Sequence, residues 1–185
     1  MNIVLDFEHD YEVSVPDELP SDSYNTFWIN GLGADTGRDS LVLQVSPHHG
    51  SRWTGVFGGG HGDLKGCWAM PSPKHLLVCS AGTGYIVDST MPGSWEQTTL
   101  ILLNQVVLDL GSRTLLIASD TEVAAYSRSG FKWCSERLSL DGVKIESVGK
   151  EAVNVLAYTP KTHSWNNIRL SLDDGKIVFT SPHFM

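Results

Sequence analysis

The chain has 185 residues, of which 41% are hydrophobic and 18% charged, and its formal net charge is −8. This composition is typical of a globular domain, and no apolar run reaches the roughly 18 residues that a membrane span needs. The few basic residues form no cluster, which argues against nucleic-acid binding because affinity for phosphates requires clustered Lys and Arg. The 18 glycines and 8 prolines, without helical periodicity, favour a single all-β domain over residues 1–185.

Residues 1–40 are predicted to form an acidic strand followed by a loop. Residues 1–24 hold seven Asp and Glu side chains and no Lys or Arg. Over residues 5–15, mostly apolar side chains alternate with polar ones, which puts alternate side chains on opposite faces of one long strand. A hairpin turn at residues 9–10 is the competing arrangement, but it would mix acids with apolar side chains on each face. The acids of the polar face are Asp6, Glu8, Asp10 and Glu12.

Such a row of carboxylates repels itself unless solvent or a partner screens it. The row is therefore either a solvated face that protects an edge strand from aggregation, or a docking surface for a basic protein. In the second interpretation Asp17 and Glu18 extend the surface. Residues 1–10 contain no basic residue and do not have the composition of a secretory signal, so we expect a cytoplasmic location.

Residues 41–112 are predicted to contain hairpins rich in glycine and histidine. If residues 41–46 pair with residues 52–57, His48 and His49 lie at the turn of this hairpin. His61 and Asp63 then follow the far end of the second strand. These ends are on the order of 20 Å apart at about 3.3 Å per residue, which argues against one metal site unless the glycine loop folds back. The alternative function of a small metal-dependent hydrolase depends on these four residues, and otherwise we expect no metal, cofactor or catalytic residue. The four residues are His48, His49, His61 and Asp63.

Tryptophans and cysteines complete the set of candidate residues. Trp53 and Trp68 flank the glycine-histidine loop and are free to face a protein partner or the apolar face of a sugar. A carbohydrate-binding module is therefore a further alternative. Cys67, Cys79 and Cys134 form no C-x-x-C unit, and they indicate buried free thiols in a reducing compartment.

Residues 113–180 carry an internal repeat of 32 residues. Residues 123–145 recur without a gap at residues 155–177. Each copy predicts antiparallel strands, an Asp-Gly hairpin turn and a tryptophan in the core. We expect at least six strands over residues 114–180, with the two copies in the same conformation. The identical pairs are Val123/Val155, Ala125/Ala157, Tyr126/Tyr158, Trp133/Trp165, Arg137/Arg169, Leu138/Leu170, Ser139/Ser171, Leu140/Leu172, Asp141/Asp173, Lys144/Lys176 and Ile145/Ile177.

Within the first copy, Leu138 and Leu140 alternate with polar residues and are expected on one face of a strand. Its turn is predicted at Asp141-Gly142, and the corresponding turn of the second copy at Asp174-Gly175.

A less regular copy precedes these two. Residues 76–80 match residues 115–119 at an offset of 39, and Trp95 precedes Trp133 by 38 positions. The recurring tryptophans and Asp-Gly turns resemble, in pattern only, the four-stranded blades of β-propellers. The resemblance implies an antiparallel meander of repeated hairpins in a small or incomplete propeller-like arrangement, and a twisted β-sandwich is the alternative.

These features describe a protein-interaction module better than an enzyme. Its most specific form is a neutralising partner of a basic protein, because a small acidic single-domain chain resembles bacterial immunity proteins in general character. Metal-dependent hydrolysis and carbohydrate binding are the alternatives. The residues assigned to partner binding are Asp6, Glu8, Asp10, Glu12, Asp17, Glu18, Trp53 and Trp68.

Overall fold

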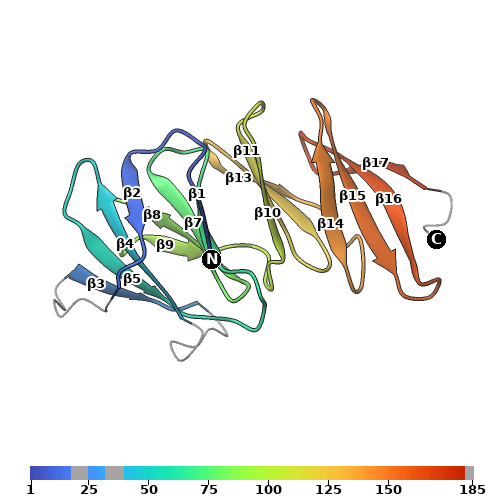
Figure 1. Ribbon diagram of the computed structural model, residues 1–185. Helices are drawn as coiled ribbons and strands as arrows, with labels where there is room; N and C mark the ends of the chain where they lie inside the picture. The colour runs from blue at the N-terminus through green and yellow to red at the C-terminus, as the bar shows by residue number, and fades with distance from the viewer. Residues whose placement is uncertain (18–24, 32–39, 182–185) are drawn as a thin grey trace. The chain divides into compact units, whose positions relative to one another are not determined.

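The computed structural model describes residues 1–17, 25–31 and 40–181, which form strands and no α-helix (Figure 1). The expected all-β fold built from antiparallel meanders is therefore confirmed. The described strands belong to four sheets, and the chain divides into two compact units, Met1–Leu102 and Leu103–Met185.

The first unit contains nine described strands in two sheets. They are β1 (Asn2–Val4), β2 (Tyr11–Ser14), β3 (Thr26–Ile29), β4 (Leu41–Pro47), β5 (Trp53–Phe57), β6 (Gly66–Ala69), β7 (His75–Ser80), β8 (Thr83–Asp88) and β9 (Trp95–Gln97). Sheet I has the order β2-β4-β5-β3, and sheet II has the order β1-β6-β7-β8-β9. β1 pairs with β6 and β3 with β5 in parallel, and the other neighbours pair antiparallel. The predicted hairpin of residues 41–46 and 52–57 is confirmed as β4–β5.

Sheets I and II share one apolar core, which includes Leu43 and Val45 of β4 and Leu76 and Val78 of β7. Buried aromatic side chains also join the two sheets, because each has a polar atom that donates a hydrogen bond to backbone at the other sheet. These bonds run from Tyr11 Oη to His75 O (2.8 Å), from Trp53 Nε1 to Ser89 O (2.7 Å) and from Tyr85 Oη to Gly58 O (2.7 Å).

The N-terminal segment is not the single long strand that its alternation predicts. β1 belongs to sheet II and β2 to sheet I, so residues 5–10 cross between the sheets outside any strand, and the competing hairpin is wrong for the same reason. A backbone hydrogen bond from Asp10 N to Pro73 O (3.0 Å) holds the crossing. The alternation of buried and exposed side chains nevertheless continues, because Phe7 and Tyr11 both enter the core.

The second unit contains two antiparallel meanders, each in chain order. Sheet III consists of β10 (Gln105–Asp109), β11 (Thr114–Ala118), β12 (Val123–Ser127) and β13 (Gly130–Cys134). Sheet IV consists of β14 (Val143–Val148), β15 (Ala152–Thr159), β16 (Ser164–Ser171) and β17 (Ile177–Thr180). The expectation of at least six strands over residues 114–180 is confirmed.

Sheets III and IV also share one core, with Leu116 and Val123 from sheet III and Val155 and Leu170 from sheet IV. The side-chain amide of Gln105 on β10 closes one border of this core. It donates to Ile145 O (2.9 Å) and accepts from Ile145 N (2.8 Å). The glutamine side chain thus makes the two hydrogen bonds to β14 that the backbone of a neighbouring strand would otherwise make.

The 32-residue repeat is out of phase with the sheets by one strand. Its first copy contains β12, β13 and β14, which are the last two strands of sheet III and the first strand of sheet IV. Its second copy contains β15, β16 and β17, which all lie in sheet IV. The expectation that both copies have the same conformation is therefore wrong. The 39-residue offset, in contrast, is in phase, since β7 and β11 are the second strands of the meanders β6–β9 and β10–β13.

A one-residue slip in register separates the two repeat tryptophans. Trp133 is opposite Ala125, after a bulge in the β12–β13 pair, whereas Trp165 is opposite Tyr158 in an unbulged pair. Because side chains alternate between faces, a slip of one residue moves a side chain to the other face. Trp133 is buried in the core at 5% exposure, but Trp165 is 51% exposed, which corrects the expectation that both are core residues.

The segment after β13 also differs from the prediction. Residues 135–142 leave sheet III instead of continuing as a strand, and Leu138 N donates to Thr121 O (2.8 Å). Leu138 is therefore buried while Leu140 is 70% exposed, so the two leucines do not share a face.

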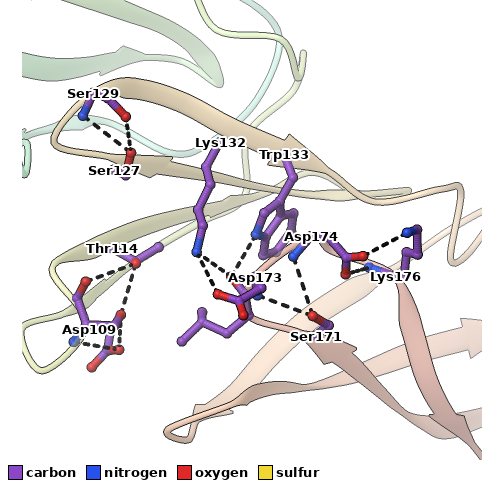
Figure 2. Close-up of polar contacts among 12 residues, drawn as sticks. Asp109, Thr114, Ser127, Ser129, Lys132, Trp133, Ser171, Asp173, Asp174 and Lys176 are labelled. Carbon is purple, nitrogen blue, oxygen red and sulfur yellow. Dashed lines mark hydrogen bonds and ion pairs between the residues drawn. The ribbon is translucent and has the colours of Figure 1, made fainter.

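Each repeat tryptophan packs across the Asp-Gly segment of the other copy. A Cβ at Gly175 would lie 2.7 Å from Trp133 Cδ2, and a Cβ at Gly142 would lie 3.0 Å from Trp165 Cη2. Gly142 lies in the connection between sheets III and IV, so the expected hairpin turn there is wrong, whereas Gly175 lies in the β16–β17 hairpin connection. Trp133 Nε1 also donates to Leu172 O (2.9 Å), which fixes the indole against this connection (Figure 2).

Candidate functional site

The acids of the N-terminal segment are displayed on the surface of the first unit. Asp6, Glu8, Asp10 and Glu12 are all exposed. Glu12 lies on β2, and the other three lie on the crossing between sheets II and I. Asp17 is exposed as well, while Glu18 lies outside the described residues.

The residues that alternate with these acids anchor the backbone of the segment to the first unit. Phe7 is 6% exposed and Tyr11 is fully buried, so the side chains on either side of Glu8 and Asp10 pull the segment onto the core. The ring of His9 lies 5.2 Å from that of Tyr11, and its Nδ1 lies 2.8 Å from Phe7 O. The carboxylates are therefore held in a fixed array instead of on a loose tail.

No described residue forms an ion pair with Asp6, Glu8, Asp10 or Glu12. Their charge is thus uncompensated at short range, and it contributes to the field that a charged partner meets in solution.

Net charge is distributed unequally between the two units. Residues 1–102 hold 12 acidic and 4 basic side chains, a net charge of −8, whereas residues 103–185 hold nine of each. The whole formal charge of the chain therefore belongs to the unit that carries the acidic segment. Net charge therefore favours the approach of positively charged molecules to the first unit, and the second unit adds no net charge to this attraction.

Trp53 and Trp68 are buried within the first unit. They are 3% and 4% exposed, and the indole nitrogen of Trp53 is already bonded within the first unit. Trp53 also packs edge to face against Phe27 at a centroid distance of 6.0 Å. The expectation that these tryptophans contact a partner or a sugar is corrected, because every residue of β5 and β6 is buried and both faces of these strands are therefore covered.

The four residues of the hydrolase hypothesis are exposed but not gathered into one site. His48 and His49 lie in the β4–β5 loop, while His61 and Asp63 follow the opposite end of β5. No group of three or more His, Cys, Asp or Glu side chains with metal-binding geometry occurs within residues 1–17, 25–31 and 40–181.

The glycines of this loop have a structural role. Gly60 N donates to Ser80 O (3.1 Å) and Gly62 N to Ala81 O (2.8 Å), so the loop adds backbone hydrogen bonds at the β7–β8 turn. A Cβ at Gly60 would lie 2.7 Å from Ala81 O, and one at Gly62 would lie 3.0 Å from Gly82 Cα. Close approach between backbones therefore requires glycine at both positions.

The three cysteines are free. Cys67 and Cys79 are buried, and burial raises the pKa of each thiol to about 12. Cys134 is half-buried, and burial raises its pKa as well. These thiols are therefore protonated at neutral pH and act as small apolar side chains.

The second unit has an exposed face that the sequence did not reveal. Trp165 (51% exposed) lies on β16, and Val178 (58%) and Phe179 (54%) lie on β17. Beside them is a groove of about 750 Å³ that reaches from Lys150 to Val178 and includes Asn154 and Arg169. A period-two pattern could not predict this face, because a register shift beside Arg169 lets both Val178 and Phe179 avoid the core.

The β16–β17 connection, residues 172–176, is fixed by polar contacts (Figure 2). Lys176 Nζ lies 2.8 Å from Asp174 Oδ2, and hydrogen bonds from Lys176 and Ser171 lower the pKa of the Asp174 carboxyl to about 2. Lys132 of β13 donates to Leu172 O (2.9 Å) and lies 3.5 Å from Asp173 Oδ1. These contacts anchor the connection within its own unit, although the Asp173 side chain itself stays 99% exposed.

The chain matches no protein-family model, and no curated protein is significantly similar to it in sequence. In the described ranges no helix has the length and apolar character needed to cross a membrane.

Proposed function

We propose that the chain is an acidic, cytoplasmic protein-interaction module that binds a basic protein partner through its first unit. Its most specific form is a neutralising protein of the immunity or antitoxin kind, on a repeat-based, propeller-like scaffold. The observation that carries the proposal is the concentration of the entire net charge of −8 in residues 1–102, together with exposed acids on an anchored backbone.

Electrostatic complementarity suits such a function because it accelerates encounter and selects for basic partners. The separated histidines and the buried Trp53 and Trp68 give no comparable support to metal-dependent hydrolysis or to carbohydrate binding.

The proposal is tested by affinity capture from the native lysate with three baits. The first is the wild type, and the second carries Glu8→Lys and Asp10→Lys. The third carries Glu136→Lys and Glu146→Lys, which change the net charge equally at exposed positions of the second unit. We expect the wild type and the third bait to capture the same basic protein, and the second bait to lose it. Capture of one set of proteins by all three baits would contradict the proposal.

A further inference from the structure

The exposed face of sheet IV is built from aromatic, aliphatic and oppositely charged side chains. Directly opposed residues on neighbouring strands share a face, and Tyr158 is opposite Trp165, while Arg169 is opposite both Asn154 and Phe179. The two rings of Tyr158 and Trp165 lie 5.4 Å apart at a tilt of 54°. Trp, Tyr and Arg are enriched among the residues that contribute most of the binding energy in protein interfaces.

The charges on this face complement one another. The groove on it is lined by two basic side chains, Lys150 and Arg169, and two acidic ones, Glu151 and Asp173. A two-fold axis places the same patch on both sides of an interface, so a patch with both signs can match a copy of itself. A strongly basic partner would repel the two basic side chains of the groove, and a strongly acidic partner would repel the two acidic ones.

We propose that this outer face of sheet IV binds a second copy of the chain in a weak two-fold dimer. Net charge favours this location, because residues 103–185 are neutral, whereas contact between two first units would bring together charges of −8 each. The inference is independent of the proposed function, since it concerns the other unit and another partner.

The small size of the face indicates a weak dimer. The four strands have 6, 8, 8 and 4 residues, and at about 4.8 Å by 3.3 Å per residue they cover about 400 Å² per copy, or about 800 Å² in total. This total is below the usual size of a stable specific interface, so we expect a weak dimer, with a dissociation constant on the order of 10 to 100 µM or weaker.

The test is sedimentation velocity on the full chain between about 5 and 500 µM, because mass action then moves a weak dimer through its transition. We expect the weight-average mass to rise from 20.3 kDa toward twice that value. Salt at about 0.5 M screens the charged contacts of the face but not its aromatic and aliphatic contacts, so the rise should weaken only in part. Association of a basic partner with the acidic unit should slow steeply under the same conditions.

Matched variants locate the interface. Trp165→Ala should raise the dissociation constant about tenfold or more. Trp28→Ala removes a tryptophan of similar exposure (63%) from the first unit and should leave the constant unchanged. Phe179→Ser gives a second test that does not depend on the stability of the Trp165 variant, and circular dichroism verifies that all variants are folded.

Two results would overturn the proposal. One is a chain that stays monomeric at the highest concentration, which would leave this face to a different kind of partner. The other is association that Trp165→Ala and Phe179→Ser weaken no more than Trp28→Ala does.

Discussion

Substitution of Gly175 tests whether the repeat is held together by packing between its copies. Gly175 has φ +71°, and a Cβ there would collide with the buried indole of Trp133. Gly130 provides a matched control in the same unit. It also has a positive φ, of +103°, but a Cβ there would meet nothing within 4 Å. Gly175→Ala therefore adds a steric collision to its backbone cost, whereas Gly130→Ala has only a backbone cost, which is at least as large because φ +103° lies farther from the left-handed helical region.

The expected losses follow from these differences. A non-glycine residue at positive φ costs about 1 to 2 kcal/mol, which is the whole expected loss in the free energy of unfolding for Gly130→Ala. Overpacking in the core adds about 1 to 3 kcal/mol for Gly175→Ala. If the indole moves far enough to break its hydrogen bond to Leu172 O, a further 0.5 to 1.5 kcal/mol or so is lost. We therefore expect Gly175→Ala to cost about 3 to 6 kcal/mol.

Urea unfolding of both variants, followed by circular dichroism, measures the two losses. The slope of free energy against urea concentration should stay unchanged, so that the shift in midpoint reports stability. Equal losses for Gly175→Ala and Gly130→Ala would refute the packing of Trp133 on the β16–β17 connection.

Three further predictions concern the repeat tryptophans, the thiols and the acidic surface. Trp133→Ala should lower the free energy of unfolding in urea by about 3 to 5 kcal/mol, whereas Trp165→Ala, at a half-exposed position, should lower it by about 1 to 2 kcal/mol. Equal losses would contradict the register slip. The raised pKa values of Cys67 and Cys79 contribute stability that is fully present below pH 9.0 and is lost as the pH rises toward about 12. Cys67→Ala should therefore reduce the fall in melting temperature at alkaline pH. A pH profile identical to that of the wild type would contradict this prediction. Once a partner is captured, its association rate with the wild type should fall steeply as salt shortens the screening length from about 10 Å to about 3 Å, and a rate independent of salt would exclude steering by the acids.

The sequence predicted those features that depend on local pattern. The alternation correctly separates the buried Phe7 and Tyr11 from the exposed acids between and beside them, although Val15 at the end of the pattern is 50% exposed. It could not show the crossing itself, because the strand partners of β1 and β2 come from β6 and β4, far along the chain. The β4–β5 hairpin was predictable because both strands and their loop are adjacent in sequence.

The limits of prediction are clearest at the repeat. Identical residues at a fixed spacing suggest equal environments, but Trp133 and Trp165 lie on opposite sides of their sheets relative to the core. The cause is one bulge residue, whose position depends on pairing and not on the side chains themselves. Trp53 and Trp68 are buried because other parts of the chain cover both faces of β5 and β6, which the residues of these strands alone do not show.

The most direct test of the proposed function is carboxylate footprinting of the complex with the captured partner. Carbodiimide labelling with an amine, read by peptide mass spectrometry, reports the accessibility of each acid with and without the partner. We expect Asp6, Glu8, Asp10 and Glu12 to be protected, and the equally exposed Glu136 and Glu146 of the second unit to keep their labelling rates. Protection of Glu136 and Glu146 with unchanged labelling of the N-terminal acids would contradict the claim that the acidic first unit binds the partner.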